Sequence, residues 1–260
     1  KKFIFKNRIG KDYDVIISCG RKSVIPSIVL KKNCNKKVIN IHIQNPKVSL
    51  QNFDFVVAPD HDSIDGPNVL ISKGAIHYLT IDEINNAKNY LVNKIEKGKD
   101  VITLILGGHT KYYSYSKEHI IEIFSKINKQ ILEKNLQLIL IPSNRTPKNI
   151  IKFAKEYFNK NSLIVDTVDK QAYLSSLSLA KYIIVTCDSS SMISEAALTE
   201  KPIYVAMIPA ARSDKRFQKF RNLLESMNII RKLEDEIDTW VYEKLDETNR
   251  IARLIKEKLS

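Results

Sequence analysis

Cysteine is scarce in this chain, and its few cysteines are not spaced for cross-linking or for metal binding. Cys19, Cys34 and Cys187 are an odd number and form no CxxC pair or cysteine–histidine ligand spacing. This pattern argues against a disulfide framework and a zinc site, and a reducing cytoplasm is the simplest inference. Cys187 has no histidine near it in sequence, so we interpret it as a small half-buried side chain rather than a nucleophile.

Long apolar runs and glycine-rich fingerprints are missing as well. Lys, Asn, Asp or Gly interrupts every apolar run well before the ~18 residues that a membrane-spanning helix needs, and we expect no signal peptide. Only 7 glycines occur, and they form neither GxGxxG nor a GxxxxGKS or GxxxxGKT loop. We therefore expect neither a nicotinamide-type Rossmann site nor a P-loop. Because the chain begins with Lys1 rather than Met, we expect its numbering to start inside a longer product or at a processed end.

Acidic residues are outnumbered, since 29 Asp and Glu stand against 42 Lys and Arg and leave a net charge of +13. This excess favours anionic partners such as nucleotides or acidic lipid surfaces, although an AT-biased genome would produce the same richness in Lys, Ile and Asn. The cations are spread over helices without a recognition-helix motif, so no nucleic-acid partner is expected. The 260 residues allow one large α/β domain or two of about 100 to 150 residues.

Short β-branched runs alternate with helical patterns, which is typical of parallel sheets covered by helices. The expected strands are 14–18, 38–43, 53–58, 101–106, 136–141, 163–165, 182–185 and 203–205. The expected helices are 24–31, 81–97, 117–133, 148–159, 171–180, one beginning near 211, and a helical tail over 237–259. Gly98-Lys99-Asp100 breaks the pattern, so we expect a boundary there between domains 1–98 and 99–260.

The segment 186–202 is the most informative in the chain, because it predicts a polar turn and a helix between two strands. The helix-capping residues in this turn are Asp188, Ser189, Ser190 and Ser191. Free N–H groups at such a helix start attract phosphate, and Glu195 follows about one turn later, within reach of a ribose. The alternative is an ordinary capped helix with a solvated glutamate.

Two other turns of the second domain are expected at the same sheet edge, because parallel strands end together there. The candidate residues in them are Gly107, Gly108, Ser143, Arg145 and Thr146. Open α/β sheets bind ligands at this edge, so we expect the three turns to hold a diphosphate together.

The first domain also has polar turns after its strands. A glycine at 20 admits close backbone approach and Arg21 can contact an oxyanion bidentately, so these two and Gln44 are candidates for an acceptor side. A plain turn with solvated cations is an equal alternative. His61 and Asp62 are the candidates for a catalytic base, with a surface turn as the default interpretation.

A basic amphipathic pattern begins near residue 211. Its apolar stripe consists of Phe217, Phe220, Leu224 and Met227, with lysines and arginines elsewhere. Such a helix can contact an anionic membrane surface. We prefer the interpretation in which the stripe packs on the protein's own core and the cations form its wet face.

Several motifs in this order resemble one known family over roughly residues 14–230. They are GRKS at 20–23, DHDSIDGPNVL at 60–70, GAIH at 74–77, GG at 107–108, SNRTP at 143–147 and DSSSMISEA at 188–196. The set resembles the bacterial relatives of the plant mitochondrial-fission (elongated mitochondria) family. Members are similar in fold to two-domain GT-B glycosyltransferases, and some have been named as predicted nucleoside-diphosphate-sugar epimerases.

This resemblance implies two Rossmann-like domains that face a cleft, with the 189–195 segment as the donor-binding turn and helix and Glu195 on the ribose. Family members usually carry a further strand, glycine turn and helix before the segment matching Asp14, so we expect an incomplete first domain. Glu200 stands where a glycine commonly precedes the Lys-Pro pair, which concerns the geometry of the helix end.

The leading hypothesis is a cytoplasmic, glycosyltransferase-like protein. It would take a sugar from a nucleoside diphosphate without a metal or other cofactor and pass it to an unknown acceptor, either cell-envelope or lipid-linked, at the inner face of the membrane. Helix N–H groups and Arg145 would neutralise the leaving diphosphate. The alternatives are a non-catalytic scaffold and a sugar-nucleotide epimerase that uses the same donor site.

Overall fold

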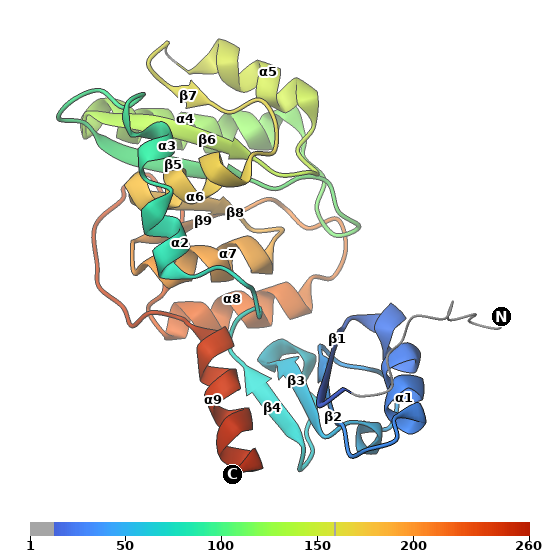
Figure 1. Cartoon of the computed structure of the whole chain (residues 1–260). Helices are drawn as coiled ribbons and strands as arrows, with labels where there is room; N and C mark the ends of the chain where they lie inside the picture. Colours follow the sequence, from blue (N-terminus) through green and yellow to red (C-terminus); the bar gives the residue numbers. More distant parts are fainter. Residues whose placement is uncertain (1–12, 159) are drawn as a thin grey trace. The chain divides into compact units, whose positions relative to one another are not determined.

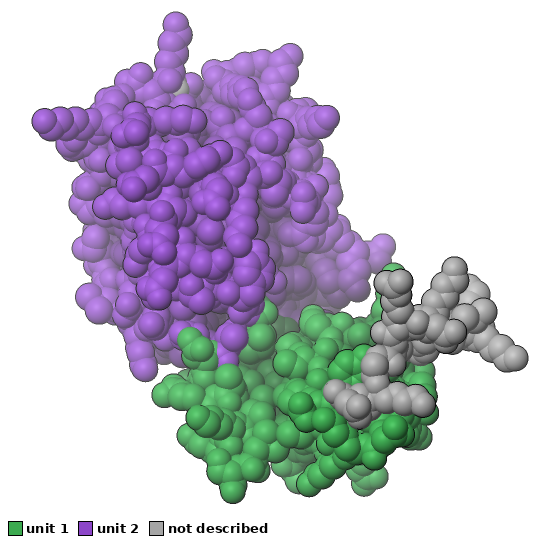
Figure 2. Space-filling view, viewed as in Figure 1, with its two compact units in different colours: residues 1–76, 249–260 green, residues 77–248 purple. Residues whose placement is uncertain are grey.

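The chain folds into two compact units, each with its own parallel sheet (Figures 1 and 2). The computed structural model describes residues 13–158 and 160–260. Unit 1 contains the described residues up to Ile76 together with Asn249–Ser260, and unit 2 contains His77–Thr248. The α/β class and the two parallel sheets expected from the sequence are confirmed.

Unit 1 is built on a four-stranded sheet. Its strands, in hydrogen-bonded order, are β1 (Val15–Cys19), β2 (Ile39–Ile43), β3 (Phe55–Pro59) and β4 (Val69–Ser72). Its helices are α1 (Val24–Asn33) and most of α9 (Glu247–Leu259), with the short 3-10 turns η1 (Arg21–Ser23), η2 (Leu50–Asn52) and η3 (Asp60–Asp62). β4 was not expected from the sequence, because four residues carry little periodicity.

Side chains of this sheet alternate between two covered faces. On one face Val56 packs with Val24 of α1 and with Phe53. On the other face Ile41 and its neighbours pack against Ile251 of α9. The C-terminal helix therefore belongs to unit 1, and not to the second domain to which the sequence pattern assigned it.

Unit 2 is built on a six-stranded sheet with the order β10-β9-β8-β5-β6-β7. Its strands are β5 (Asp100–Leu106), β6 (Leu136–Pro142), β7 (Leu163–Ile164), β8 (Ala180–Thr186), β9 (Ile203–Ala206) and β10 (Ile230–Lys232). Its helices are α2 (Ile81–Asn86), α3 (Asn89–Val92), α4 (Lys117–Glu133), α5 (Lys148–Tyr157), α6 (Lys170–Leu179), α7 (Ser190–Ala196) and α8 (Lys215–Ser226), with η4 (Ala197–Thr199). Residue 159, the end of the helix expected over 148–159, lies outside the described residues.

The centre of unit 2 is continuously apolar. Nearly every residue of β5, β6 and β8 is buried, as expected for parallel strands covered by helices on both faces. α4 adds Ile120, Phe124 and Ile127 at helical spacing, and the Phe124 ring stacks on Phe153 of α5 at 5.7 Å. This core holds the carboxyl ends of the central strands in fixed positions.

The segment 81–97 belongs to unit 2 and not to the expected 1–98 domain. It forms α2 and α3 instead of one helix, and both pack on α6. At the interruption, the Ser175 hydroxyl donates to the carbonyl of Lys88 (3.0 Å) and accepts from the amide of Leu91 (3.1 Å). A side chain of α6 thus takes hydrogen bonds that a continuous helix would have made within its own backbone.

The apolar stripe of α8 packs on the core of unit 2. Phe220 and Leu224 are buried there, and Phe217 and Met227 pack against the same cluster. This confirms the preferred interpretation of the amphipathic pattern. The helix begins at Lys215, later than expected.

The tail is helical over only part of the expected 237–259 range. Residues before α9 run irregularly and bury Ile237, Tyr242 and Leu245 in the unit 2 core. Within the described residues, no helix combines the length and apolar character that crossing a bilayer requires.

Candidate functional site

Three polar turns meet at the carboxyl edge of the unit 2 sheet. Gly107-Gly108 follows β5, the 143–146 turn follows β6, and the 188–191 turn follows β8. Hydrogen bonds link the first turn to both of the others. The sequence predicted this shared edge, because parallel strands end at the same side of a sheet.

Asp188 is the hydrogen-bonding centre of this cluster. Its buried carboxylate accepts from the Gly108 amide (3.2 Å), the Tyr115 hydroxyl (2.6 Å), the Thr186 hydroxyl (2.8 Å) and Nη2 of Arg145 (2.7 Å). Burial and the adjacent carboxylate raise the pKa of Tyr115, so its hydroxyl remains a donor. Asp188 therefore joins the turns from inside, whereas the sequence suggested a helix cap.

The cap of α7 is the next residue. Ser189 accepts a hydrogen bond from the amide of Met192 at 3.4 Å. Ser189 and Ser190 are half-buried, and Ser191 is exposed. One residue thus caps the helix, and the neighbouring hydroxyls lie at the surface of the same turn.

Both glycines are required by close packing. Added Cβ atoms would lie 2.2 Å from the carboxylate oxygens of Asp188 at Gly107, and 1.9 Å from the carbonyl oxygen of Arg145 at Gly108. The Gly107 amide donates to Thr186 at 2.8 Å, and the Gly108 amide donates to Asp188. Because both amides are engaged inside the protein, the glycines shape the turn, and their contribution to diphosphate binding stays a prediction.

The 143–146 turn presents one cation. Thr146 donates to the carbonyls of Leu106 (2.9 Å) and Gly107 (2.6 Å), and it accepts from the Ser143 amide (2.8 Å). Ser143 and Thr146 therefore fix the turn. The Arg145 side chain remains 42% exposed, and Nη2 is its only nitrogen that is hydrogen-bonded among the described residues. A guanidinium carries several further N–H donors, so Arg145 can hold Asp188 and an oxyanion together.

Glu195 lies further along α7 and is held by a residue that the sequence gave no reason to select. The Tyr173 hydroxyl on α6 donates to Oε2 of Glu195 at 2.6 Å. Burial raises the pKa of Glu195, and the bond from Tyr173 and the proximity of His77 oppose that rise. His77 is itself fixed by Thr248, which accepts from its amide (3.2 Å) and donates to its carbonyl (2.7 Å).

In unit 1, Gly20 and Gln44 come together at the carboxyl edge of β1 and β2. The Gly20 amide donates to the carbonyl of Ile43 at 3.2 Å, and its φ of 77° lies in the left-handed region that favours glycine. Gln44 shares that conformation with φ 84°, and its Oε1 would lie 3.7 Å from a Cβ at Gly20. Arg21 is exposed and starts η1. The predicted acceptor-side residues therefore share one edge.

His61 and Asp62 lie on η3, directly after β3, and both are partly exposed. β3 pairs with β2 in parallel, so η3 follows the same sheet edge as Gln44. Their role as a catalytic base stays a prediction.

Cys187 is buried, accepts a hydrogen bond from the amide of Ile208 (3.3 Å), and has a pKa raised by burial to about 11. A thiol in these surroundings is a poor nucleophile, in keeping with its interpretation as a filler.

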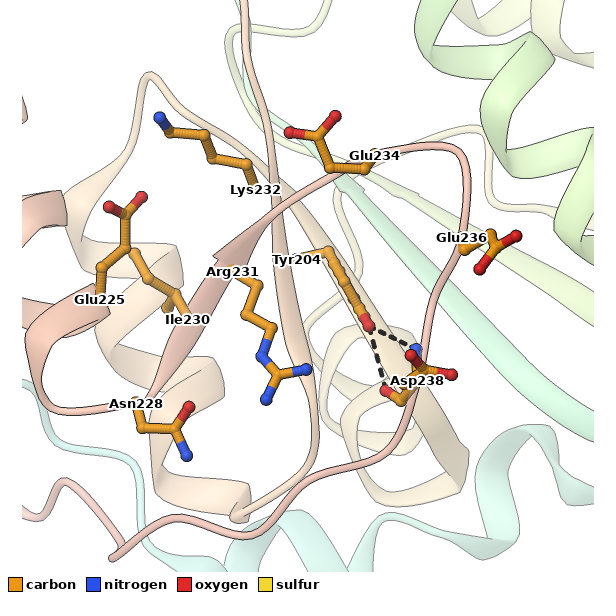
Figure 3. Close-up of a pocket in the computed structure, with 9 residues that line it drawn as sticks. All are labelled: Tyr204, Glu225, Asn228, Ile230, Arg231, Lys232, Glu234, Glu236 and Asp238. Atoms are coloured by element: carbon orange, nitrogen blue, oxygen red, sulfur yellow. Dashed lines mark hydrogen bonds between the residues drawn. The ribbon is translucent and has the colours of Figure 1, made fainter.

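A separate hollow of about 490 Å³ lies beside β9 and β10 (Figure 3). Its lining is of mixed charge: Tyr204, Glu225, Asn228, Ile230, Arg231, Lys232, Glu234, Glu236 and Asp238. The Tyr204 hydroxyl is bound to the backbone of Asp238, and Arg231 lies 4.2 Å from the centre of the Trp240 ring. None of the predicted site residues lines this hollow. Over residues 13–158 and 160–260, no three His, Cys, Asp or Glu side chains are grouped to hold a metal ion.

Comparison with known proteins identifies relatives over nearly the whole chain. A family model described as mitochondrial fission ELM1 matches residues 4–259. An uncharacterized protein of Rickettsia prowazekii (strain Madrid E) is 28% identical over 281 residues, which cover 94% of this chain and 79% of the relative. The mitochondrial fission protein ELM1 of Arabidopsis thaliana is 22% identical, and the match covers 95% of this chain but only 64% of that protein.

Solved structures show the same type of fold. UDP-GlcNAc 2-epimerase from Methanocaldococcus jannaschii matches with a TM-score of 0.55 at 15% identity, over 94% of this chain and 77% of that one. The Neisseria meningitidis enzyme, bound to UDP-GlcNAc, gives 0.55 at 13%, over 95% and 75%. Acinetobacter baumannii MurG gives 0.50 at 12%, over 95% and 66%. These likenesses establish a GT-B-like fold.

Proposed function

The chain belongs to the mitochondrial fission ELM1 family, and we propose that its unit 2 binds a nucleoside diphosphate sugar and gives up the sugar to an acceptor. The fold is glycosyltransferase-like.

The observation that carries the proposal is the position of the Asp188 cluster in the sheet. From β5 the chain proceeds through β6 and β7 on one side, and then returns to β8, β9 and β10 on the other. The reversal falls between β5 and β8, whose following turns hold Gly107 and Asp188. Open α/β sheets bind ligands outside the carboxyl ends of their strands at such a reversal.

The groups at this point suit a diphosphate. Arg145 supplies a partly exposed cation whose orientation is fixed by Asp188. The hydroxyls of Ser190 and Ser191 lie on the neighbouring turn. Glu195 follows on the same helix, about 7.5 Å beyond Ser190 along the helix axis at ~1.5 Å per residue. That spacing is comparable to the distance from a diphosphate to its ribose hydroxyls.

The chemistry required of the protein is neutralisation of the leaving diphosphate. Arg145 and the polar turn beside it would stabilise the charge that develops as the bond to the sugar breaks. His61 or Asp62 of unit 1 is our candidate for the base that deprotonates the acceptor. The neighbour bound to UDP-GlcNAc supports nucleotide sugars as the first ligands to test, but a likeness of fold does not separate transfer from epimerisation.

The test is a binding titration. UDP, GDP, CDP and dTDP and their sugars are titrated by calorimetry and thermal shift into the wild type, Arg145→Gln and Glu195→Ala. A specific ligand at 100 times its Kd should stabilise the fold by about 2.7 kcal/mol. Both variants should lose that shift, while the exposed α9 controls Arg253→Gln and Glu257→Ala keep it. Absence of binding by every member of the panel would overturn the proposal.

A turnover assay tests the proposed sugar transfer and its metal independence. With the nucleotide selected, release of the free diphosphate in the presence of cell-envelope or lipid-linked acceptors should continue in EDTA, since we propose metal-independent transfer. Loss of turnover in EDTA would contradict metal independence, and conversion of the sugar nucleotide to its epimer without an acceptor would replace transfer as the activity.

A further inference from the structure

Helix α1 covers one face of the unit 1 sheet (Figure 1) and carries apolar side chains on two of its own faces. Val24 and Ile28 pack toward the sheet, in one cluster with Val56 of β3. Ile25 and Val29 lie outside that cluster and are 51% and 36% exposed. A helix that covers a sheet needs only one apolar face, so the packing of unit 1 does not explain the second.

Lysines stand at both ends of this second face. Lys22 precedes Ile25 by three residues, Val29 follows Ile25 by four, and Lys32 follows Val29 by three. The turn η1, which holds Lys22, runs directly into α1, and residues three and four apart lie on one side of a helix. Both lysines are exposed. The four residues therefore form one exposed line along the helix, which we call the α1 stripe.

The surroundings of the α1 stripe are positively charged. No Asp or Glu occurs between residues 20 and 38, whereas Lys and Arg occur six times. Lys31 and Lys36 are neutralised by ion pairs with Asp54 (2.5 Å) and Asp14 (2.8 Å). The other four are exposed and make no ion pair within the part of the chain that the structure describes: Arg21, Lys22, Lys32 and Lys37. An apolar centre with a rim of unpaired cations matches the chemistry of an anionic bilayer surface.

We propose that the α1 stripe is a docking surface for an anionic lipid bilayer. Ile25 and Val29 enter the boundary between headgroups and acyl chains, while Lys22 and Lys32 extend to the lipid phosphates. A nucleic acid would pair with the cations but leave the apolar side chains in water. A second copy of the chain would bring the same positive rim against this one. The inference is independent of the proposed nucleotide site, which lies in unit 2.

The strength of this docking follows from its charges. Each Lys or Arg near an anionic surface contributes about fivefold in affinity, so the four unpaired cations supply about several hundredfold. Salt screens this attraction, because the Debye length shortens from ~10 Å at 0.1 M to ~3 Å at 1 M. Two apolar side chains add too little for a permanent anchor, so binding should be reversible and should be lost at high salt.

The experiment is flotation of the full chain with vesicles, at low and high salt. The vesicles contain phosphatidylcholine alone or an equal mixture of phosphatidylcholine and phosphatidylglycerol. Two double variants divide the stripe into its apolar and cationic halves: Ile25→Ser with Val29→Ser, and Lys22→Gln with Lys32→Gln. The matched control is Leu132→Ser with Lys134→Gln, which removes an exposed apolar side chain and an exposed lysine from unit 2.

The wild type and the control should float only with the anionic vesicles, and only at low salt. The apolar double variant should weaken binding about tenfold or more, and the lysine double variant about 25-fold. All variants should keep the wild-type melting temperature, because each replaced side chain is exposed. Failure of the wild type to float, or equal flotation of the wild type and both stripe variants, would overturn the inference.

A tryptophan probe tests whether the stripe itself contacts the bilayer. Lipids brominated in their acyl chains should quench the fluorescence of Ile25→Trp but not that of Leu132→Trp, whose new ring lies on α4. Trp240, the only tryptophan of the wild type, gives both variants the same background. Equal quenching at the two positions would place the contact elsewhere and contradict the proposal.

Two further measurements address the other possible partners. Tighter binding of the wild type to a uridine homopolymer than to the anionic vesicles would assign the rim to nucleic acid. A dimer that the stripe variants dissociate would assign the surface to a second copy of the chain, and either result would overturn lipid docking. Absence of nucleotide binding in unit 2 would overturn the proposed function and leave this inference in place.

Discussion

The two sheets of this protein treat buried polar groups differently. In unit 2 the fully buried Thr103 donates to the carbonyl of Ser176 at 3.0 Å, and Gln137 donates to the carbonyls of Lys94 and Asn161. In unit 1 the side-chain amide of Asn40 is fully buried, and neither of its polar atoms has a partner.

His42 extends the contrast, since it lies on the same face of β2 as Asn40. Its Nδ1 is bound to the Ser18 hydroxyl at 2.8 Å, whereas Nε2 is buried without a partner. Unsatisfied buried groups carry a desolvation cost that satisfied ones recover. The contrast holds for the strands themselves, since the described buried atoms without a partner in unit 2 belong to His77 and to His119 and Gln130 of α4. β2 of unit 1 therefore has stability to gain, whereas the strands that lead to the candidate site do not.

The largest effect is expected at Asp188. Asp188→Ala leaves Arg145, Tyr115 and the Gly108 amide without their buried acceptor and should cost about 3 to 5 kcal/mol of unfolding free energy. In unit 1, Asp54 accepts from Lys31 at 2.5 Å and from the backbone amide of Asn40 at 2.6 Å, but its side chain is 35% exposed, so Asp54→Ala should cost less, about 1 to 2 kcal/mol.

Urea unfolding measures both variants, with the fluorescence of Trp240, the only tryptophan, as the probe for unit 2 and hydrogen exchange in β2 as the probe for unit 1. Equal losses would remove the distinction between the two units.

The next effect concerns close packing. Gly108→Ala would press a methyl group against the Arg145 backbone and should destabilise the protein by about 1 to 3 kcal/mol. Gly66→Ala in unit 1 meets the ends of the Leu50 and Val69 side chains at 3.1 and 3.3 Å, which can shift, so it should cost clearly less. Thermal melting of both variants tests the order, and a larger loss at Gly66 would contradict it.

Periodicity predicted most of the fold. α4 has the expected bounds of 117–133, because its apolar positions recur at strict helical spacing and Ser116 caps it. The sequence missed β4 and β10, since runs of four and three residues carry too little pattern. The break between α2 and α3 depends on the Ser175 hydroxyl, a tertiary contact that local sequence does not encode.

The location of the candidate site was predictable from the sequence, but the roles of its residues were not. Turns after parallel strands had to share an edge, so Arg145 and Asp188 were expected together. The role of Asp188 was not, because its partner Tyr115 lies 73 residues away in the chain. Tyr173 likewise looked like any aromatic residue on a helix until the fold brought it to Glu195. Local sequence pattern thus predicts which residues lie at the carboxyl edge of the sheet. Tertiary packing decides which of them are already hydrogen-bonded within the protein.

Acid should weaken unit 1 first. Burial lowers the pKa of His42 below its ordinary value of 6.5, so the unfolded state takes up a proton before the folded state does. The free energy of unfolding should therefore fall as pH drops below about 6.5. The total loss is up to about 1.4 kcal/mol for each unit by which the pKa of His42 is lower in the folded state than in the unfolded state. Hydrogen exchange in β2 at pH 7.5 and 5.5 measures this loss. His42→Gln should abolish it, and an unchanged pH slope in that variant would assign the loss to another group.

Substitutions at Asn40 and Thr103 should change the free energy of unfolding in opposite directions. Asn40→Leu replaces an unsatisfied amide by an apolar group of similar size and should stabilise unit 1 by about 1 kcal/mol. Thr103→Val removes a satisfied donor and should destabilise unit 2 by about the same amount. Urea midpoints with the two probes named above test the signs, and a loss of stability in Asn40→Leu would mean that its amide is satisfied in solution.

The smallest expected change in stability comes from the backbone conformation of one residue in unit 2. Glu200 adopts φ 59°, a left-handed conformation in which a Cβ is strained, at the helix end where the family resemblance predicted a glycine. Glu200→Gly removes that strain but gives the unfolded chain more freedom, so the net gain should be about 0.5 to 1 kcal/mol. Its side chain is exposed, which limits other losses. Glu200→Ala separates the causes: it deletes the same carboxylate and keeps the Cβ, so it should leave the melting temperature almost unchanged. A gain in both variants would assign the effect to charge, and unit 2 would then hold no backbone strain at this turn.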